Sequence, residues 1–303
     1  MEKLFNTPVL LIIFNRIDTT KLVFQAIGKV KPHQLFIAAD GPRTDRENEA
    51  EKCETVRKYV LDNIDWDCEV KTLFRDQNLG CGIGPATAIT WFFEHVDEGI
   101  ILEDDCLPHP DFFEYCQELL KLYRQDTRIF LISGYNKQGT WNTDAYDYFF
   151  SNLGGIWGWA SWARAWKYFD INMNDIDDFI AKNNFYNLLG AEIGPIRQNT
   201  ICSEIRTQKM DAWDYQWGYA RHKNNGLACV PSKNLITNIG FGQNATHTKD
   251  NMLQPNTYGL TFPLRINNFI VPDRIYDQKF IGYTPPIQTD LIKRFKEKIK
   301  KYV

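Results

Sequence analysis

The sequence has no long hydrophobic run, no Cys-x-x-Cys pair and almost no net charge. Its apolar run at residues 9–14 is far too short to span a membrane and lacks a signal-peptide cleavage region. The seven cysteines follow neither a metal-binding nor a disulfide spacing, which is typical of reduced thiols. With 35 Lys and Arg against 38 Asp and Glu, the formal net charge of -3 argues against a dedicated nucleic-acid binder. We therefore expect a cytoplasmic protein that binds no nucleic acid.

The chain does contain a regular alternation of short apolar runs and longer amphipathic segments. Its 303 residues, 44% of them hydrophobic, are enough for one large domain or two small ones. Strands are predicted at residues 9–14, 35–39, 70–74, 99–102, 129–133 and 148–151, and helices at 19–30, 46–61, 83–95, 110–123 and 215–223. Such an order predicts an α/β fold, Rossmann-like, with a mixed but mainly parallel sheet flanked by helices. Because no long linker divides the chain, we expect a single domain.

Charged residues follow each of the first four predicted strands. They include Arg16 after the first strand, Asp40 after the second, Arg75 after the third and the triplet Glu103-Asp104-Asp105 after the fourth. In parallel sheets, ligands bind beyond the carboxyl ends of the strands. Three adjacent carboxylates repel one another unless a cation is present, and oxygen ligands of this kind suit Mg²⁺ or Mn²⁺. The sequence thus predicts a ligand site with a divalent cation at this edge, although a solvated acidic turn would also fit the triplet.

Several segments resemble, in order, those of glycosyltransferases with the GT-A fold. The segment Leu102–Tyr115, Leu-Glu-Asp-Asp-Cys-Leu-Pro-His-Pro-Asp-Phe-Phe-Glu-Tyr, resembles the acidic motif of the N-acetylglucosaminyltransferase that initiates complex N-glycans and of bacterial family-2-like transferases. Further resemblances, spread over residues 8–250, are Phe14-Asn15-Arg16, Ala39-Asp40-Gly41, Asn78-Leu79-Gly80, Gly154-Gly155-Ile156-Trp157-Gly158-Trp159 and Trp213-Asp214-Tyr215-Gln216-Trp217. The first-strand motif departs from many bacterial relatives by having Ile17 in place of proline.

The resemblance implies roles for the residues at the strand ends. Asp105 would be the direct metal ligand, Asp104 would hold the ribose, and Asp40 would accept a hydrogen bond from the base. Arg16 would lie near the base or the ribose, and Glu103 would be buried or behind the ligands. The resemblance therefore places a nucleotide-diphosphate sugar at these residues.

Two further residues are expected to contact the donor. His247 lies in a glycine-bearing segment that resembles the flexible loop closing over the donor in GT-A enzymes, where a late histidine meets the diphosphate or the metal. Gly82, with Gly80 and Gly84, would let the backbone approach the nucleotide, although an ordinary loop explains these glycines equally well.

An acceptor hydroxyl must lose a proton as it attacks, which needs a carboxylate or a histidine in reach. The resemblance gives this role to Asp214, with Asp211 as the second candidate, because Tyr215 stands where the eukaryotic enzymes have another Asp. A structural role for Asp214, capping the helix predicted after it, is the alternative.

Seven of the nine tryptophans fall between residues 141 and 217. Aromatic faces pack against the apolar faces of sugars, but large aromatic residues also dominate cores, and we expect most of these tryptophans to be buried. Trp157 and Trp213 are the two predicted to contact the acceptor, because they lie beside the motif segments.

The last thirteen residues, 291–303, form a basic amphipathic pattern with six basic residues and one acidic. Such a helix is typical of attachment to an anionic membrane, although a solvated helix packed on the domain would show the same pattern. The expected organisation is a GT-A domain at 1–290, with a nucleotide-binding half at 1–107 and an acceptor-binding half at 108–290, followed by this tail. The protein would be cytoplasmic or peripheral at the inner face of the plasma membrane.

Together, the resemblance implies an inverting, metal-dependent glycosyltransferase that uses Mn²⁺ or Mg²⁺. It would move a hexosyl or N-acetylhexosaminyl group from a UDP-linked donor to a glycan or lipid-linked acceptor, in bacterial surface polysaccharide assembly. A sugar nucleotidyltransferase or a non-catalytic carbohydrate-binding protein are the alternatives. The first lacks a glycine-rich, basic signature near the N-terminus, and the second leaves the acidic triplet unexplained.

Overall fold

The computed structural model describes residues 5–207, 211–240 and 255–283. The first half contains β1 (Val9–Ile13), α1 (Ile17–Val30), β2 (Gln34–Ala39), α2 (Glu49–Asp62), β3 (Glu69–Phe74), α3 (Gly80–Phe93), β4 (Glu98–Glu103) and β5 (Cys106–Pro108). The second half contains α4 (Asp111–Tyr123), β6 (Ile129–Ser133), β7 (Tyr148–Ser151), β8 (Trp159–Trp162), α5 (Ala163–Trp166), α6 (Ile176–Ala181), α7 (Asn184–Thr200), the π-helix η1 (Ile201–Ile205), α8 (Asp214–Lys223), β9 (Leu227–Pro231), β10 (Ile236–Asn238) and α9 (Arg274–Phe280).

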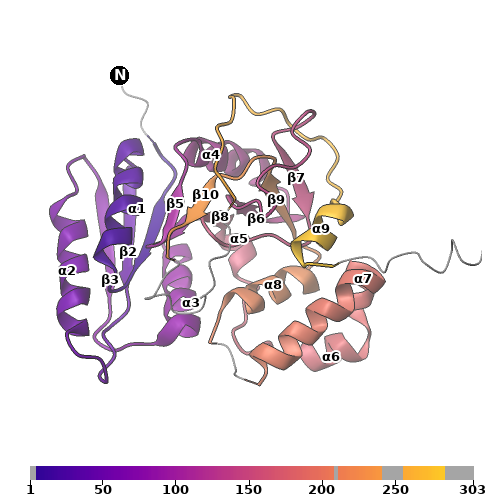
Figure 1. Ribbon diagram of the computed structural model, residues 1–303, viewed down its shortest axis with the longest axis horizontal. Helices are drawn as coiled ribbons and strands as arrows, with labels where there is room; N and C mark the ends of the chain where they lie inside the picture. The colour runs from indigo at the N-terminus through magenta and orange to yellow at the C-terminus, as the bar shows by residue number, and fades with distance from the viewer. Residues whose placement is uncertain (1–4, 208–210, 241–254, 284–303) are drawn as a thin grey trace, which may run out of the picture.

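An eight-stranded sheet, in the order β3-β2-β1-β4-β8-β6-β9-β7, forms the centre of the molecule (Figure 1). The first four strands pair in parallel, whereas β8 is antiparallel to β4 and to β6. Strand β9 is parallel to β6, and β7 is antiparallel to β9. The predicted α/β fold with a mixed, mainly parallel sheet is therefore confirmed, and strands from both predicted halves join the same sheet.

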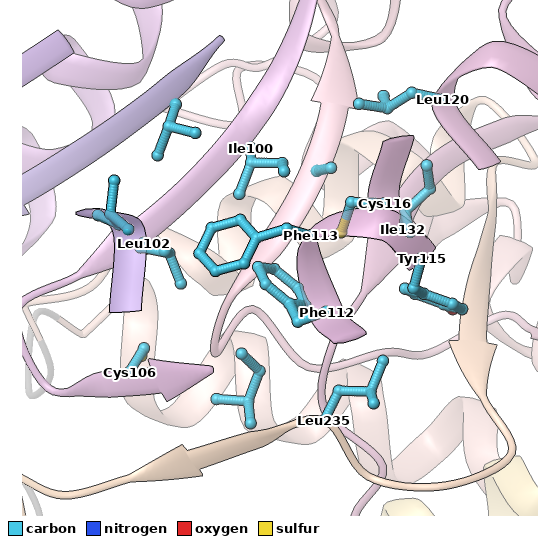
Figure 2. Close-up of a cluster of buried hydrophobic side chains, with 14 of the residues drawn as sticks. Ile100, Leu102, Cys106, Phe112, Phe113, Tyr115, Cys116, Leu120, Ile132 and Leu235 are labelled. Carbon is cyan, nitrogen blue, oxygen red and sulfur yellow. The ribbon is translucent and has the colours of Figure 1, made fainter. Parts of the chain in front are cut away.

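Helices cover both faces of the sheet because its strands are apolar on both sides. In β1, Val9, Leu11 and Ile13 face one buried cluster and Leu10 faces the other, as the alternation of a strand requires. The first cluster includes side chains of α1, α2 and α4, and the second includes side chains of α3, α5 and α8. Figure 2 shows Phe112 and Phe113 of α4 among the buried residues of the first cluster. A third cluster lies among α6, α7 and η1, which lie beside the sheet with α8 (Figure 1).

Differences between predicted and observed elements concentrate in the second half. Helix α3 begins three residues before its predicted start, at Gly80, and contains Pro85 as its sixth residue. The aromatic segment after residue 157 contains β8, Trp-Ala-Ser-Trp, which was not predicted because it is not a continuous aliphatic run like those of the predicted strands. Helices α6 and α7, and the strands β9 and β10, were also not predicted. Among the described residues, no helix is both long and apolar enough to cross a membrane.

Candidate functional site

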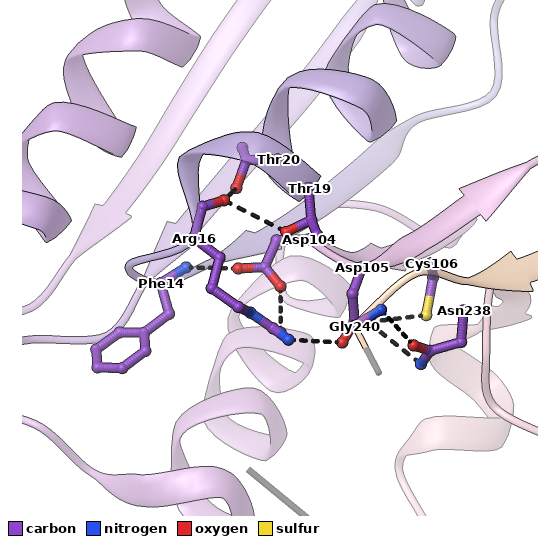
Figure 3. Close-up of polar contacts among 9 residues, drawn as sticks. All are labelled: Phe14, Arg16, Thr19, Thr20, Asp104, Asp105, Cys106, Asn238 and Gly240. Atoms are coloured by element: carbon purple, nitrogen blue, oxygen red, sulfur yellow. Dashed lines mark hydrogen bonds and ion pairs between the residues drawn. The ribbon is translucent and has the colours of Figure 1, made fainter. Parts of the chain in front are cut away.

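The acidic triplet lies where β4 ends, next to the end of β1. Parallel pairing places Ile12 of β1 opposite Glu103, so the residues that follow both strands meet at one edge of the sheet. There, Arg16 donates from Nη2 to Asp104 Oδ1 at 2.5 Å, and its Nη1 lies 3.0 Å from Asp105 Oδ2 (Figure 3). The backbone N–H of Phe14 donates to the other oxygen of Asp104 at 3.3 Å. The sheet therefore brings together three of the predicted donor-binding residues, Arg16, Asp104 and Asp105.

A segment that is distant in the sequence, residues 238–240, also contacts Asp105. Strand β10 pairs with β5, and the N–H of Ile239 donates to the Asp105 carbonyl at 2.8 Å. Asn238 Nδ2 lies 3.5 Å from Asp105 Oδ1, and a Cβ built on Gly240 would come within 2.2 Å of Asp105 Oδ2. Only glycine fits there, with the Asp105 carboxylate against its backbone (Figure 3). Asn238 and Gly240 are site residues that the sequence did not identify individually.

The site carries more negative than positive charge. Burial raises the pKa of Glu103, and the charges of Asp105, Asp104 and Asp214 raise it further. Burial also raises the pKa of Asp104, although Arg16 opposes this. The pKa of Arg16 is raised because Asp104 and Asp105 outweigh its burial. One guanidinium thus faces three carboxyl groups, which leaves room for a second cation.

The fit of a divalent metal rests on the chemistry of these donors. In the part of the chain that the structure describes, no three His, Cys, Asp or Glu side chains are grouped so that they could hold a metal ion. Mg²⁺ is commonly held by one or two carboxylates, with substrate phosphates and waters as the other ligands. Asp105 offers such a carboxylate, with the carboxyl groups of Glu103 and Asp104 and the guanidinium of Arg16 near it, so the residues fit Mg²⁺ or Mn²⁺ bound together with a diphosphate.

Asp40 lies at the end of β2 and faces the start of α3. Its Oδ2 accepts hydrogen bonds from the N–H groups of Leu79 at 2.8 Å and of Gly80 at 3.2 Å. Its Oδ1 is buried and has no hydrogen-bond partner among the described residues. A buried acceptor without a partner is costly. A ligand N–H that reached this oxygen would satisfy it, while the other oxygen stabilises the helix.

The buried carboxylate of Glu49 links the loops that follow β1 and β2 by hydrogen bonds. Glu49, on α2, accepts hydrogen bonds from Asn15 Nδ2 at 2.9 Å and from the Arg43 backbone at 2.7 Å. The Arg43 side chain also bonds Glu49 and lies over the ring of Phe14, 5.4 Å from its centroid. Hydrogen bonding from Arg43 lowers the pKa of Glu49 against the effect of burial. Sequence analysis missed Glu49 because it looks like one more charge on a solvated helix.

The two candidate bases lie on either side of the start of α8. Asp211 approaches α3 so closely that a Cβ on Gly80 or Gly82 would come within 2.5 Å or 2.3 Å of its carboxylate oxygens. The close approach that Gly82 permits here is therefore to Asp211, and its predicted contact with a nucleotide stays a prediction. Asp214 is the first residue of α8, and its charge contributes to the raised pKa of Glu103. The structure thus places Asp214 near the acidic triplet and leaves the choice of base open.

The tryptophans are mainly buried, as expected. Trp213 is 4% exposed, and its ring stacks on Trp159 with centroids 5.8 Å apart. Its ring thus packs in the core, and the predicted acceptor contact of Trp213 stays a prediction. Trp157 is partly buried against Tyr135, with centroids 4.6 Å apart. His247 and the tail at 291–303 lie outside the described residues.

Comparisons with known proteins show neither a family nor an activity. No family model matches the chain, and no curated protein matches it. The inositol-1-phosphate CTP transferase from T. maritima is 9% identical, with a TM-score of 0.39 over 74% of this chain and 85% of its own. A UDP-glucose pyrophosphorylase complexed with UDP-glucose is 10% identical, with a TM-score of 0.31 over 54% and 79%. A cytidylyltransferase from Leptospira borgpetersenii is 10% identical, with a TM-score of 0.32 over 70% and 75%. Scores this low carry no argument about function.

Proposed function

We propose that this chain binds a nucleotide-diphosphate sugar at the ends of β1, β2 and β4 and transfers the sugar to an acceptor hydroxyl. The observation that carries the proposal is the meeting of Arg16 with Asp104 and Asp105 at one edge of the sheet. Asp40, with its unpartnered buried oxygen, follows the neighbouring strand. Donors and acceptors of hydrogen bonds thus lie along the edge where a nucleotide would lie.

Each group has a role in this reaction. Asp40 Oδ1 would accept an N–H of the base, and Asp104, held by Arg16, would accept the ribose hydroxyls. Asp105 would hold Mn²⁺ or Mg²⁺, which when bound supplies positive charge next to the leaving diphosphate. A carboxylate, Asp214 or Asp211, would take the proton of the acceptor hydroxyl as its oxygen attacks the anomeric carbon. The bond from that carbon to the phosphate breaks, and its electron pair leaves with the diphosphate, so the configuration inverts.

The proposal also includes the class of the donor, the class of the acceptor and the location of the enzyme. The donor would be UDP-linked, and the acceptor a glycan or a lipid-linked sugar of bacterial surface polysaccharide assembly. A cytoplasmic enzyme could reach a lipid-linked acceptor through residues 291–303 on an anionic membrane surface, as the composition of that tail predicts.

Nucleotidyl transfer to a sugar phosphate is the second candidate, because it would use the same nucleotide-binding edge of the sheet. Against it, three residues separate the end of β1 at Ile13 from the start of α1 at Ile17. So short a connection offers no glycine-rich loop to cradle a triphosphate there.

The test is a panel of sugar nucleotides with Mn²⁺ or Mg²⁺, read by thermal shift, calorimetry and slow hydrolysis. We expect one UDP-sugar to raise the melting temperature of the wild type. We expect Asp105→Asn to weaken the metal-dependent binding of that sugar by about tenfold or more, which corresponds to about 1.4 kcal/mol or more. Asp45→Asn is the control, because the Asp45 side chain is 75% exposed and lies outside the site. Unchanged affinity in Asp105→Asn would refute the metal role. Release of pyrophosphate from CTP or UTP with a sugar phosphate would establish the second candidate instead.

A further inference from the structure

The guanidinium of Arg197, on α7, lies against the first turns of α8. Its Cζ is 5.0 Å from the centroid of the Tyr215 ring. A Cβ built on Gly218 would come within 2.1 Å of Arg197 Nη2, so this glycine leaves the space that the guanidinium occupies. Residues four apart on a helix share a face, and Gly218 therefore lies on the same face of α8 as Asp214. The guanidinium is thus next to the helix face that carries the candidate base.

Charges of both signs surround this pair. Burial lowers the pKa of Arg197, and the carboxylate of Asp214, followed by the side chain of Tyr215, opposes the effect. Asp214 is also near the carboxyl of Glu103 on β4, since its charge contributes to the raised pKa of that group. Asp214 therefore interacts with a carboxyl group on β4 and with a guanidinium on α7.

Two further basic side chains, Arg221 and His222, are close enough to Arg197 for its charge to lower their pKa values. Burial, followed by the charge of Arg197, lowers the pKa of Arg221 to about 9, and Asp277 opposes this. Burial, followed by Arg197 and Arg221, also lowers the pKa of His222 well below its ordinary range. Asp277 acts on Arg221, whereas Asp214 and Tyr215 are the groups that favour the charge of Arg197. The charge of Arg197 is thus balanced mainly on the side of Asp214.

We propose that Arg197 is a positioning residue, which holds the carboxylate of Asp214 by opposite charge in the orientation that receives the proton of the acceptor hydroxyl. The inference rests on the proposed sugar transfer, with Asp214 as its base. Arg197 itself neither gives nor takes a proton: the acceptor proton moves to the Asp214 carboxylate, the new C–O bond forms, and the diphosphate leaves with the electron pair of the broken bond.

The test compares Arg197→Met, which removes the charge, with Arg197→Lys, which keeps it on a flexible stem. In the holoenzyme with Mn²⁺ and a UDP-sugar, we expect Arg197→Met to lower kcat about tenfold to hundredfold, less than the roughly 10²- to 10⁴-fold that a general base contributes, because the base itself remains. The donor KM should stay the same, and Arg197→Lys should recover part of kcat. Gly218→Ala should lower kcat as well, because a methyl group there displaces the guanidinium while both charges remain.

Arg164→Met is the matched control. The Arg164 guanidinium is partly buried and donates to the carbonyls of Tyr123, Arg124 and Ile129, on helices and strands away from Asp214. Its loss should lower the urea denaturation midpoint and leave kcat at the wild-type value. A kcat loss caused merely by a weaker fold would appear in this variant as well.

A second measurement needs no activity. We expect Arg197→Met and Asp214→Asn to shift the urea denaturation midpoint non-additively, with the double variant losing less than the sum of the two. Wild-type kcat in Arg197→Met, a loss confined to donor KM, or additive midpoint shifts would each overturn the inference. If the wild type transfers no sugar while the midpoints remain coupled, the pairing of Arg197 with Asp214 holds and only the proposed function fails.

Discussion

The two halves of the molecule place their charged side chains in different ways. In the half that ends at β5, the charges follow parallel strands and meet at one edge of the sheet, as Arg16 and Asp104 do. In the other half, they lie buried between helices, as Arg221 and Asp277 do at 3% and 0% exposure. The sheet therefore positions the proposed donor site, whereas helix packing positions the groups around Asp214. Variants in each half should consequently fail for different reasons.

The largest expected effect concerns the aromatic core of the second half. Trp217 is fully buried and packs against Trp166, with centroids 5.0 Å apart, and against Trp159 at 6.0 Å. We expect Trp217→Ala to lower the free energy of unfolding by about 3–5 kcal/mol, because a large cavity replaces the indole. Urea denaturation measures this loss. Phe269→Ala, at a residue 69% exposed, should change stability by less than about 0.5 kcal/mol. Equal losses in the two variants would mean that this half has no rigid core.

The first half was largely predictable because its first four strands, β1 to β4, contain short apolar runs that are recognisable in the sequence. Short apolar runs predicted β1 to β4 to within two residues at either end, and the rule for parallel sheets then brought Arg16 and the acidic triplet to one edge. Two strands of the second half were likewise predicted: β6 over residues 129–133 and β7 over residues 148–151. In these elements the buried position of a residue follows from its neighbours in the sequence.

The second half was less predictable because its contacts join residues without a shared pattern. Arg197 meets α8 some twenty residues later, and Gly218, which makes room for it, looks like an ordinary glycine within a helix. Glu49 and Gly240 escaped notice for the same reason, since each gains its role from a loop distant in sequence. Trp213 has a packing role that the sequence did not indicate: its place beside a motif suggested a ligand contact, and in the structure its ring stacks on Trp159.

A smaller effect would sharpen the comparison within the first half. Asp40 combines a helix-capping oxygen with an unpartnered one, so its two roles can be separated. We expect Asp40→Ala to lower the free energy of unfolding by about 0.5–2 kcal/mol, as the loss of a helix cap does. Asp40→Asn should lose less, since an amide oxygen can still accept from Leu79 and Gly80.

Calorimetry with the UDP-sugar would then test the second role of Asp40. Either substitution should weaken binding if Oδ1 accepts an N–H of the base, whereas Asp45→Ala should affect neither stability nor affinity. Full affinity in Asp40→Ala would confine this residue to its structural role and move base recognition elsewhere on the same edge.

The smallest expected effect is a pH dependence of stability in the second half. Asp277 accepts hydrogen bonds from the Ser151 hydroxyl and from Asn152, whose N–H lies at 3.2 Å. Burial raises the pKa of Asp277 although these hydrogen bonds lower it. A carboxyl with a raised pKa in the folded state holds its proton where the unfolded chain has released it. The stability that this group contributes is therefore complete below the ordinary carboxyl pKa and is lost as the pH rises through the raised one.

Urea denaturation of the wild type and Asp277→Asn across the acidic range measures this dependence. The side-chain NH2 group of the asparagine would face a group that donates to Asp277 in the wild type, either the Ser151 hydroxyl or Asn152. We therefore expect the variant to be less stable at the acidic end. As the pH rises, the wild type alone loses stability at this position, and the gap between the two proteins should narrow. A gap that widens instead would mean that Arg221 on α8, whose charge interacts with that of Asp277 on α9, stabilises the ionised carboxylate more than burial disfavours it. Charges buried between helices would then be balanced as closely as those at the edge of the sheet.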